Sequence, residues 1–200
     1  MHLARGVINR APTLLEIPMM TRDEALAWLN EKIKTKNLVK HMLATEACMG
    51  ALAARLGEDA ERWRMAGLLH DIDLDTVGKD MTRHGHTSAD WLKEKGFPDD
   101  VVRAVRAHPG HVPLETRMDI ALMSVDPLTG LIVSAALIHP SKKIASIDAE
   151  FVLKRFGERR FAAGASRDEI RKCAMLAIPL EEFVAIALDA MKAIAADIGL

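Results

Sequence analysis

The stretch GLLHDIDLD, residues 67–75, places a histidine and an aspartate side by side at the end of an apolar run. Two further acidic residues, Asp73 and Asp75, follow at alternate positions. Imidazole and carboxylate groups together suit divalent ions such as Fe, Mn, Co, Ni or Zn. A His-Asp pair also occurs in ordinary polar loops, so a metal site at His70 and Asp71 requires ligands from elsewhere in the chain.

His41 lies on the apolar face of a helix predicted for residues 38–56. Leu38, Cys48 and Leu52 fall on the same side at helical spacing, so the imidazole points toward the core. A lone histidine in such a place is more often a hydrogen-bonded core residue than a metal ligand. The helix pattern alone therefore leaves both interpretations of His41 open.

His70 and Asp126 also interrupt apolar helix faces. Before His70, the small residues Ala66 and Gly67 leave room for another element to approach. Asp126 shares its face with apolar side chains, and a buried carboxylate needs a cation or several hydrogen-bond donors. Its position before Pro127 also allows a simpler interpretation, in which it marks a helix break.

In chain order, the residues with metal-binding side chains in these contexts are His41, His70, Asp71, His84, His108 and Asp126. This order resembles the HD superfamily of metal-dependent phosphohydrolases, whose pattern is H…HD…D, often with two further histidines between. The similarity runs from about Thr21 to at least Gly130 and includes RMAGLLHDID, RHGHTSADWL, VVRAVRAHPGH and SVDPLTGLI. An HD dipeptide alone is not specific, whereas the ordered set within these helices is.

The resemblance implies a role for each of these residues. By matching position, a first metal ion would be held by His41, His70, Asp71 and Asp126. A second ion would be held by His84 and His108, with Asp71 bridging the two sites.

The sequence departs from the family pattern at two places. The family's frequent His-His pair begins at His108, but Pro109 stands in its second position, and His111 is a candidate replacement. The segment HDID replaces the common HDIG, and the DGxGYP signature of HD-GYP phosphodiesterases is absent after His108. The chain therefore resembles a small HD hydrolase rather than a cyclic-di-GMP phosphodiesterase.

The ligand set that the resemblance implies fits hydrolysis of a phosphoester. Four neutral histidines and two aspartates around two divalent ions leave about two positive charges, which favours a phosphate group. A bound metal lowers the pKa of water from about 16 toward 7 and so supplies a nucleophile at neutral pH. The predicted catalytic residues are Asp71, as bridging ligand, and Asp73, as proton carrier or partner of a ligand histidine. The predicted substrate-binding residues are Lys40, Arg83 and His111.

The elements that must position these residues are predicted to be helices. No run of residues favours a strand, aromatic residues make up only 4 %, and capping boxes stand at TRDE and SRDE. The segment 71–85 is expected to be an irregular loop, and Pro127 is expected to kink or split its helix. The expected helices are 21–34, 38–56, 59–69, 87–95, 98–107, 116–137, 147–156 and 180–198.

The chain of 200 residues is long enough for one domain with a substantial core. We expect an all-α, single-domain helical bundle over residues 21–200, with the metal-binding core at about 37–135 and a loosely ordered extension at 1–20. No apolar run reaches the ~20 residues of a membrane-spanning helix. Two cysteines are too few for a disulfide framework, which favours a reducing cytoplasm.

The resemblance and the chemistry together predict a metal-dependent phosphohydrolase, a phosphomonoesterase or phosphodiesterase, that acts on a nucleotide or another small phosphorylated metabolite. One or two divalent ions would be its cofactor. The formal net charge of −1 gives no global field for a nucleic acid polymer or an anionic membrane. Two alternatives stay open: an oxygenase with two irons in the same six-ligand set, and an HD-type module that binds without catalysis.

Overall fold

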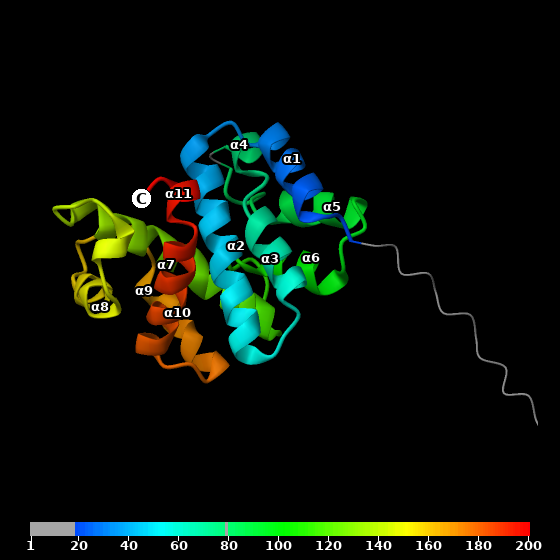
Figure 1. Ribbon diagram of the computed structural model, residues 1–200. Coiled ribbons are helices and arrows are strands. Elements are labelled where there is room, and N and C mark those ends of the chain that lie inside the picture. Colours follow the sequence, from blue (N-terminus) through cyan, green and yellow to red (C-terminus); the bar gives the residue numbers. More distant parts are fainter. Residues whose placement is uncertain (1–18, 79) are drawn as a thin grey trace, which may run out of the picture.

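The computed structural model describes residues 19–78 and 80–200, and all regular secondary structure in this part of the chain is helical (Figure 1). The all-α prediction is confirmed. The larger helices are α1 (Arg22–Lys32), α2 (Lys36–Leu56), α3 (Ala60–Leu69), α5 (His86–Glu94), α6 (Asp99–Ala107), α7 (Arg117–Ile138), α8 (Ala149–Gly157) and α10 (Leu180–Ala193). The shorter segments are α4 (Leu74–Val77), η1 (Ile144–Ser146), α9 (Arg167–Ile170), η2 (Arg171–Leu176) and α11 (Ala195–Ile198).

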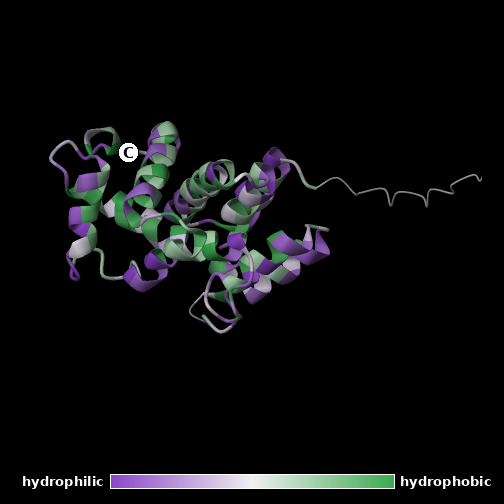
Figure 2. Ribbon diagram, turned by 90° about the horizontal axis from the view of Figure 1, so that it is seen from below, coloured by the Kyte–Doolittle hydropathy of each residue, from purple (hydrophilic) through white to green (hydrophobic). Residues whose placement is uncertain are grey.

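Helix α2 lies at the centre of the fold, with α3 packed along one side of it and α10 along another (Figure 1). The long helix α7 contacts α2, α6, α8 and α10. Coloured by hydropathy, many of the helices carry both green and purple segments, as expected where one face of a helix is buried (Figure 2). One cluster of buried side chains extends from α1 to α11.

The predicted extension falls mostly on residues 1–18, which lie outside the described residues. The division of the chain into this extension and one domain at 21–200 therefore stays a prediction.

Pro127 was expected to kink or split its helix, and α7 continues through it, so the split does not occur. A proline removes one backbone donor and crowds the preceding turn. Here Val125 and Leu128, on either side of it, are fully buried, and tertiary packing holds the helix together. By length and composition alone α7 could also cross a membrane, but 61 % of its most apolar window is buried inside the fold, as in a core helix.

Two further expectations of local structure need correction. The segment 71–85 is not wholly irregular, because α4 forms within it. The Asp75 carboxylate accepts hydrogen bonds from the backbone N–H groups of Lys34 (2.6 Å) and Thr35 (3.1 Å), and so ties α4 to the start of α2. The final predicted helix is interrupted at Ile194, whose φ of −114° and ψ of 21° separate α10 from α11.

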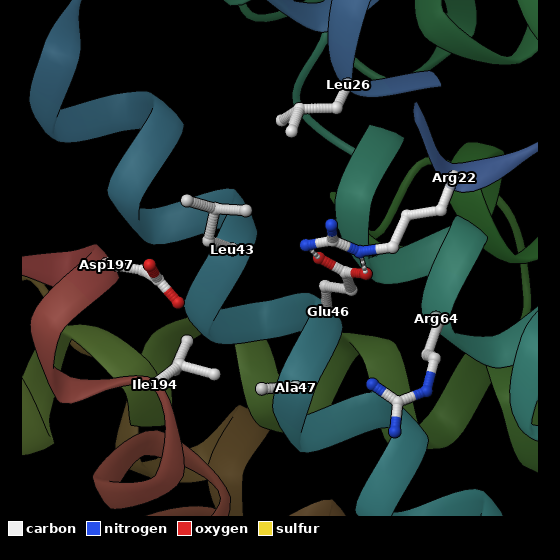
Figure 3. A pocket seen from close by; sticks show the side chains of 8 residues that line it. All are labelled: Arg22, Leu26, Leu43, Glu46, Ala47, Arg64, Ile194 and Asp197. Carbon is white, nitrogen blue, oxygen red and sulfur yellow. Dashed lines mark hydrogen bonds and ion pairs between the residues drawn. The ribbon is translucent and has the colours of Figure 1, made fainter. Parts of the chain in front are cut away.

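The pair Arg22–Glu46 fixes α1 to the middle of α2. The Arg22 guanidinium donates to both oxygens of the Glu46 carboxylate, at 2.5 and 2.9 Å, and Glu46 is only 3 % exposed. Figure 3 shows this pair at the edge of a cavity of about 420 Å³ that is also lined by Leu26, Leu43 and Arg64. No predicted metal ligand lines this cavity.

Helices α2 and α3 lie in close contact at Gly67. A Cβ atom on Gly67 would lie 2.8 Å from the Thr45 carbonyl oxygen and 2.9 Å from the backbone nitrogen of Glu46. The absence of a side chain at this position therefore allows the backbones to touch, as the small residues before His70 suggested. His70 follows directly after this crossing, at the C-terminal end of α3.

We expect Gly67→Ala to lower the free energy of unfolding by about 1–3 kcal/mol, because the new methyl group meets backbone atoms that cannot rotate away. Urea unfolding measures the change. Gly157→Ala is the matched control, since a Cβ atom there would meet nothing within 4 Å. Equal stability of the two variants would show that the α2–α3 contact is not as tight as described.

Candidate metal centre

The six predicted ligands come from five elements and meet at one place in the interior. They are His41 in α2, His70 and Asp71 at the end of α3, His84 just before α5, His108 at the end of α6 and Asp126 in the middle of α7. Their ligand atoms fall into overlapping groups in which all atoms lie within 4.8 Å of one another. Residues up to 85 positions apart, from His41 to Asp126, are thereby brought together.

The first group of donor atoms is centred on the Nε2 atom of His41. It lies 3.2 Å from His70 Nε2, 3.0 Å from Asp126 Oδ1 and 3.5 Å from Asp71 Oδ2. His70 Nε2 is 3.4 Å from the same Asp71 oxygen. Two imidazoles and two carboxylates therefore face a common point.

The second group lies on the other side of Asp71. His84 Nε2 and His108 Nε2 are 3.1 Å apart, and each is 3.3 Å from Asp71 Oδ1. The two oxygens of Asp71 thus face different pairs of histidines, one oxygen to each pair.

Two of the histidines make the same hydrogen bond to the end of their own helix. His70 and His108 each follow the last residue of a helix and keep a helical backbone. The Nδ1–H group of each donates to the carbonyl three residues earlier, Gly67 O at 2.8 Å and Val105 O at 2.6 Å. A carbonyl can only accept, so Nδ1 carries the proton and Nε2 presents its lone pair to the cluster.

Asp73 fixes His84 in the same tautomer. Its Oδ1 atom accepts from His84 Nδ1 at 2.8 Å, and its Oδ2 atom accepts from the backbone N–H groups of Gly85 (2.9 Å) and Ser88 (3.0 Å). The carboxylate is fully buried, and although burial raises its pKa, the hydrogen bonds from His84 and Ser88 outweigh this and keep the pKa below its usual value. Asp73 is therefore an ionised acceptor for the His84 ring.

Thr129 holds the His41 ring in the same tautomer. The Thr129 hydroxyl donates to the Asp126 carbonyl at 2.9 Å, and so accepts from His41 Nδ1 at 2.9 Å. Sequence reasoning did not identify Thr129. The signal that could have found it is its place three residues after Asp126, on the same face of α7.

These contacts decide whether a cation fits the cluster. With all four Nδ1 atoms committed elsewhere, lone pairs of His41 and His70 face each other at 3.2 Å, and those of His84 and His108 at 3.1 Å. Such pairs repel unless a proton or a cation lies between them. Imidazole nitrogens and carboxylate oxygens in this number are a donor set for a divalent transition metal, and the residues fit one.

The titration behaviour agrees with a cation-binding site. For His41, burial lowers the pKa, but the carboxylates of Asp126 and Asp71 outweigh it and raise the pKa to about 8. For His70, burial prevails and lowers the pKa to about 4. Burial raises the pKa values of Asp71 and Asp126, yet the neighbouring histidines bring both below the usual range. Both carboxylates are therefore ionised at neutral pH.

The structure separates the three predicted substrate-binding residues. Lys40 lines a cavity that also touches His41. Arg83 is exposed, and within the described part of the chain its side chain makes no hydrogen bond or ion pair.

His111 does not join the cluster as a replacement for the missing second histidine. Its ring stacks on His86 with centroids 4.9 Å apart, and its Nε2 atom lies 3.0 Å from the Met81 carbonyl. Pro109 instead packs against Gly85, where a Cβ atom would lie 2.5 Å from its ring.

The sequence-family model of the HD domain matches residues 38–149, a segment that contains all six clustered residues. The chain belongs to the HD domain family. This confirms the resemblance drawn from the ordered histidines and aspartates, and it places the chain in a superfamily of metal-dependent phosphohydrolases.

Known relatives of this HD protein include two ribonucleases. Ribonuclease Y of Oleidesulfovibrio alaskensis is 33 % identical over 100 residues, which cover 48 % of this chain and 18 % of that protein. Ribonuclease Y of Desulfotalea psychrophila is 34 % identical over 95 residues, with 48 % and 18 % covered. The chain thus spans less than a quarter of the length of these relatives. No solved structure matches it.

We expect His108→Ala to weaken metal binding mainly at the second group, because the nearest donor atoms to His108 Nε2 are His84 Nε2 at 3.1 Å and Asp71 Oδ1 at 3.3 Å. His41→Ala should instead weaken binding at the first group. Metal content after dialysis against Mn²⁺, measured by mass spectrometry, distinguishes the two variants. His139→Ala, outside the cluster, is the control. Loss of all metal from the His108 variant would contradict two separate groups.

Metal affinity should rise with pH in the neutral range. The pKa of His41, about 8, means that its ring carries a proton at pH 7 that a metal ion must displace. Below this pKa the apparent affinity should fall by up to about tenfold per pH unit for each proton displaced. Calorimetric titration with Mn²⁺ in buffers of different ionisation enthalpy measures both the affinity and the protons released. An affinity independent of pH below 8 would contradict the assignment of His41 as a ligand.

Proposed function

We propose that this HD protein hydrolyses phosphoesters with two divalent ions held by the cluster. The observation that carries the proposal is the position of Asp71. Its Oδ2 atom is 3.5 Å from His41 Nε2, and its Oδ1 atom is 3.3 Å from the Nε2 atoms of both His84 and His108. One carboxylate between two sets of imidazoles is suited to holding two cations at a fixed separation.

When bound, such ions lower the pKa of a coordinated water and neutralise charge on phosphoryl oxygens. The protein's own contribution is to present the ligands in one tautomer and one orientation. Asp73 does this for His84, because both of its oxygens are engaged in hydrogen bonds with His84, Gly85 and Ser88. The contacts therefore favour Asp73 as a positioning residue over Asp73 as a proton carrier.

The accessible edge of the cluster determines where a substrate can approach. The side chains of His41 and Asp126 are 22 % and 32 % exposed, whereas that of Asp71 is 7 % exposed. Lys40 lines the cavity next to His41, which supports its assignment as a contact for a substrate anion. A phosphate group approaching from this side reaches His41 and Asp126 first.

The substrate class is proposed from size and charge. We propose a nucleotide or another small phosphorylated compound, since the net charge of −1 provides no general attraction for a polyanion. The names of the relatives suggest RNA as the alternative, but their similarity covers only 18 % of each ribonuclease. Hydrolysis of small esters and of RNA is therefore compared directly in the experiment.

We expect Asp71→Asn to reduce phosphoester hydrolysis by at least about 100-fold, because the amide removes the negative charge and one of the two carboxylate oxygens that face the two pairs of histidines. The assay uses Mn²⁺-loaded protein with p-nitrophenyl phosphate, bis(p-nitrophenyl) phosphate and RNA. Circular dichroism checks that the variant remains folded. Asp168→Asn is the matched control, because the side chain of Asp168 is 98 % exposed and lies outside the cluster.

Two outcomes would end the proposal. One is full activity of the Asp71 variant. The other is an iron-loaded protein that cleaves no phosphoester but consumes oxygen with an organic substrate, as the oxygenase alternative requires.

A further inference from the structure

Gly130 stands in the interior of α7, four residues after Asp126, and neither backbone conformation nor packing requires it. Its φ is not positive, and a Cβ atom there would meet nothing within 4 Å. Glycine inside a helix lowers stability relative to alanine, because it loses more conformational freedom on folding. Gly67 and Gly85 have close neighbours that explain them, whereas Gly130 faces open space.

Two cavities border Gly130, and both also border His41. Their volumes are about 350 and 340 Å³. Gly130 and His41 therefore mark the place where the two cavities meet the accessible edge of the metal centre. A side chain at position 130 would project into this place.

The first cavity is mainly apolar and has one lysine in its lining. Its apolar lining includes Val133, Leu137, Ile198 and Leu200, and Lys40 provides the positive charge. Figure 1 shows α11, which contributes Ile198, beside α2. This cavity suits a planar or apolar group such as a nucleobase or an aryl ring.

The second cavity has a wall of small residues, 162–165, beside Asp126 and Ser134. The Arg167 guanidinium holds this wall, donating from Nη1 to the carbonyls of Ala162 (2.7 Å) and Ala165 (2.8 Å). Within this wall Ala162 has a φ of 43°, which is unfavourable for a residue with a side chain. The small wall is therefore held in place beside the metal centre.

We propose that the two cavities hold the two groups esterified to one phosphate, so that the substrate is a small phosphodiester whose phosphate lies beside His41, which borders both cavities. The proposal rests on the phosphohydrolase function proposed above and selects diesters over monoesters, which carry only one organic group. Hydrolysis adds the oxygen of water to phosphorus and breaks one P–O ester bond. One proton of the water passes to the leaving alkoxide, giving an alcohol, and the other stays on the phosphomonoester.

The test compares Gly130→Leu with unmodified protein on a diester, bis(p-nitrophenyl) phosphate, and a monoester, p-nitrophenyl phosphate. Binding is measured by calorimetry and turnover by absorbance, both with Mn²⁺-loaded protein. The leucine side chain should raise the Kd and KM for the diester by at least about tenfold and those for the monoester by a smaller factor, because a monoester fills only one of the two cavities. Metal content should be unchanged.

Two further variants separate blocking of the cavities from a general effect on the fold. Gly130→Ala should raise the Tm, because a methyl group restores helix propensity, and should raise the KM for the diester less than Gly130→Leu does, because the methyl group is smaller. Gly157→Leu makes the same substitution at another glycine with open space that borders neither cavity, and should leave binding of both esters unchanged.

The outcomes distinguish this inference from the proposed function. Monoester turnover with no preferential effect of Gly130→Leu on the diester would overturn the inference and leave phosphohydrolase function standing. Diester binding that Gly130→Leu weakens, without any cleavage, would support the two cavities and overturn hydrolysis. Preference for a long RNA over a dinucleotide by more than about tenfold would overturn a small diester as substrate.

Discussion

Imidazole lone pairs that face each other at 3.1–3.2 Å need a positive charge between them, and the rest of the structure is arranged around this constraint. Each of the four imidazole rings is held in one orientation, because its Nδ1–H group donates a hydrogen bond to a neighbouring oxygen atom. Two ionised carboxylates complete a buried group of charges that is unfavourable alone. The free energy released when a cation binds therefore also stabilises the fold.

Most of this arrangement comes from ordinary helix ends. The last carbonyls of a helix have no partner within it, and His70 and His108 each satisfy one of them with Nδ1–H. Gly67 serves two purposes in this scheme. Its carbonyl accepts from His70, and its lack of a side chain lets α2 approach closely enough for His41 to reach the same centre. Packing of α2 on α3 and assembly of the ligands are thus one event.

The sequence predicted the ligands better than it predicted their partners. His41 and Asp126 could be found because each interrupts a periodic apolar face, and the helices that carry them are long. Thr129 was not identified, and the two roles predicted for Asp73 were not separated, because a hydroxyl or carboxylate in a helical protein has many partners within reach. The prediction that His111 replaces the missing histidine was wrong for a related reason. Spacing along a loop does not determine where a side chain points, and the His111 ring stacks on His86 instead. Similarly, α7 remains helical at Pro127 because its neighbouring residues are buried, and this burial depends on elements distant in sequence.

Family membership extends to residue 149 and accounts for the ligands, but not for everything that a substrate would touch. The small wall at 162–165 and the apolar residues Ile198 and Leu200 come from the chain beyond that point. Relatives that share the HD segment can therefore share the metal chemistry and still differ in substrate. Arg167 donates to backbone carbonyls of the wall and not to its side chains. The side chains at 162–165 can therefore vary while the backbone of the wall stays in the same position. Substitutions in this wall can change which substrate fits without changing the positions of the metal ligands.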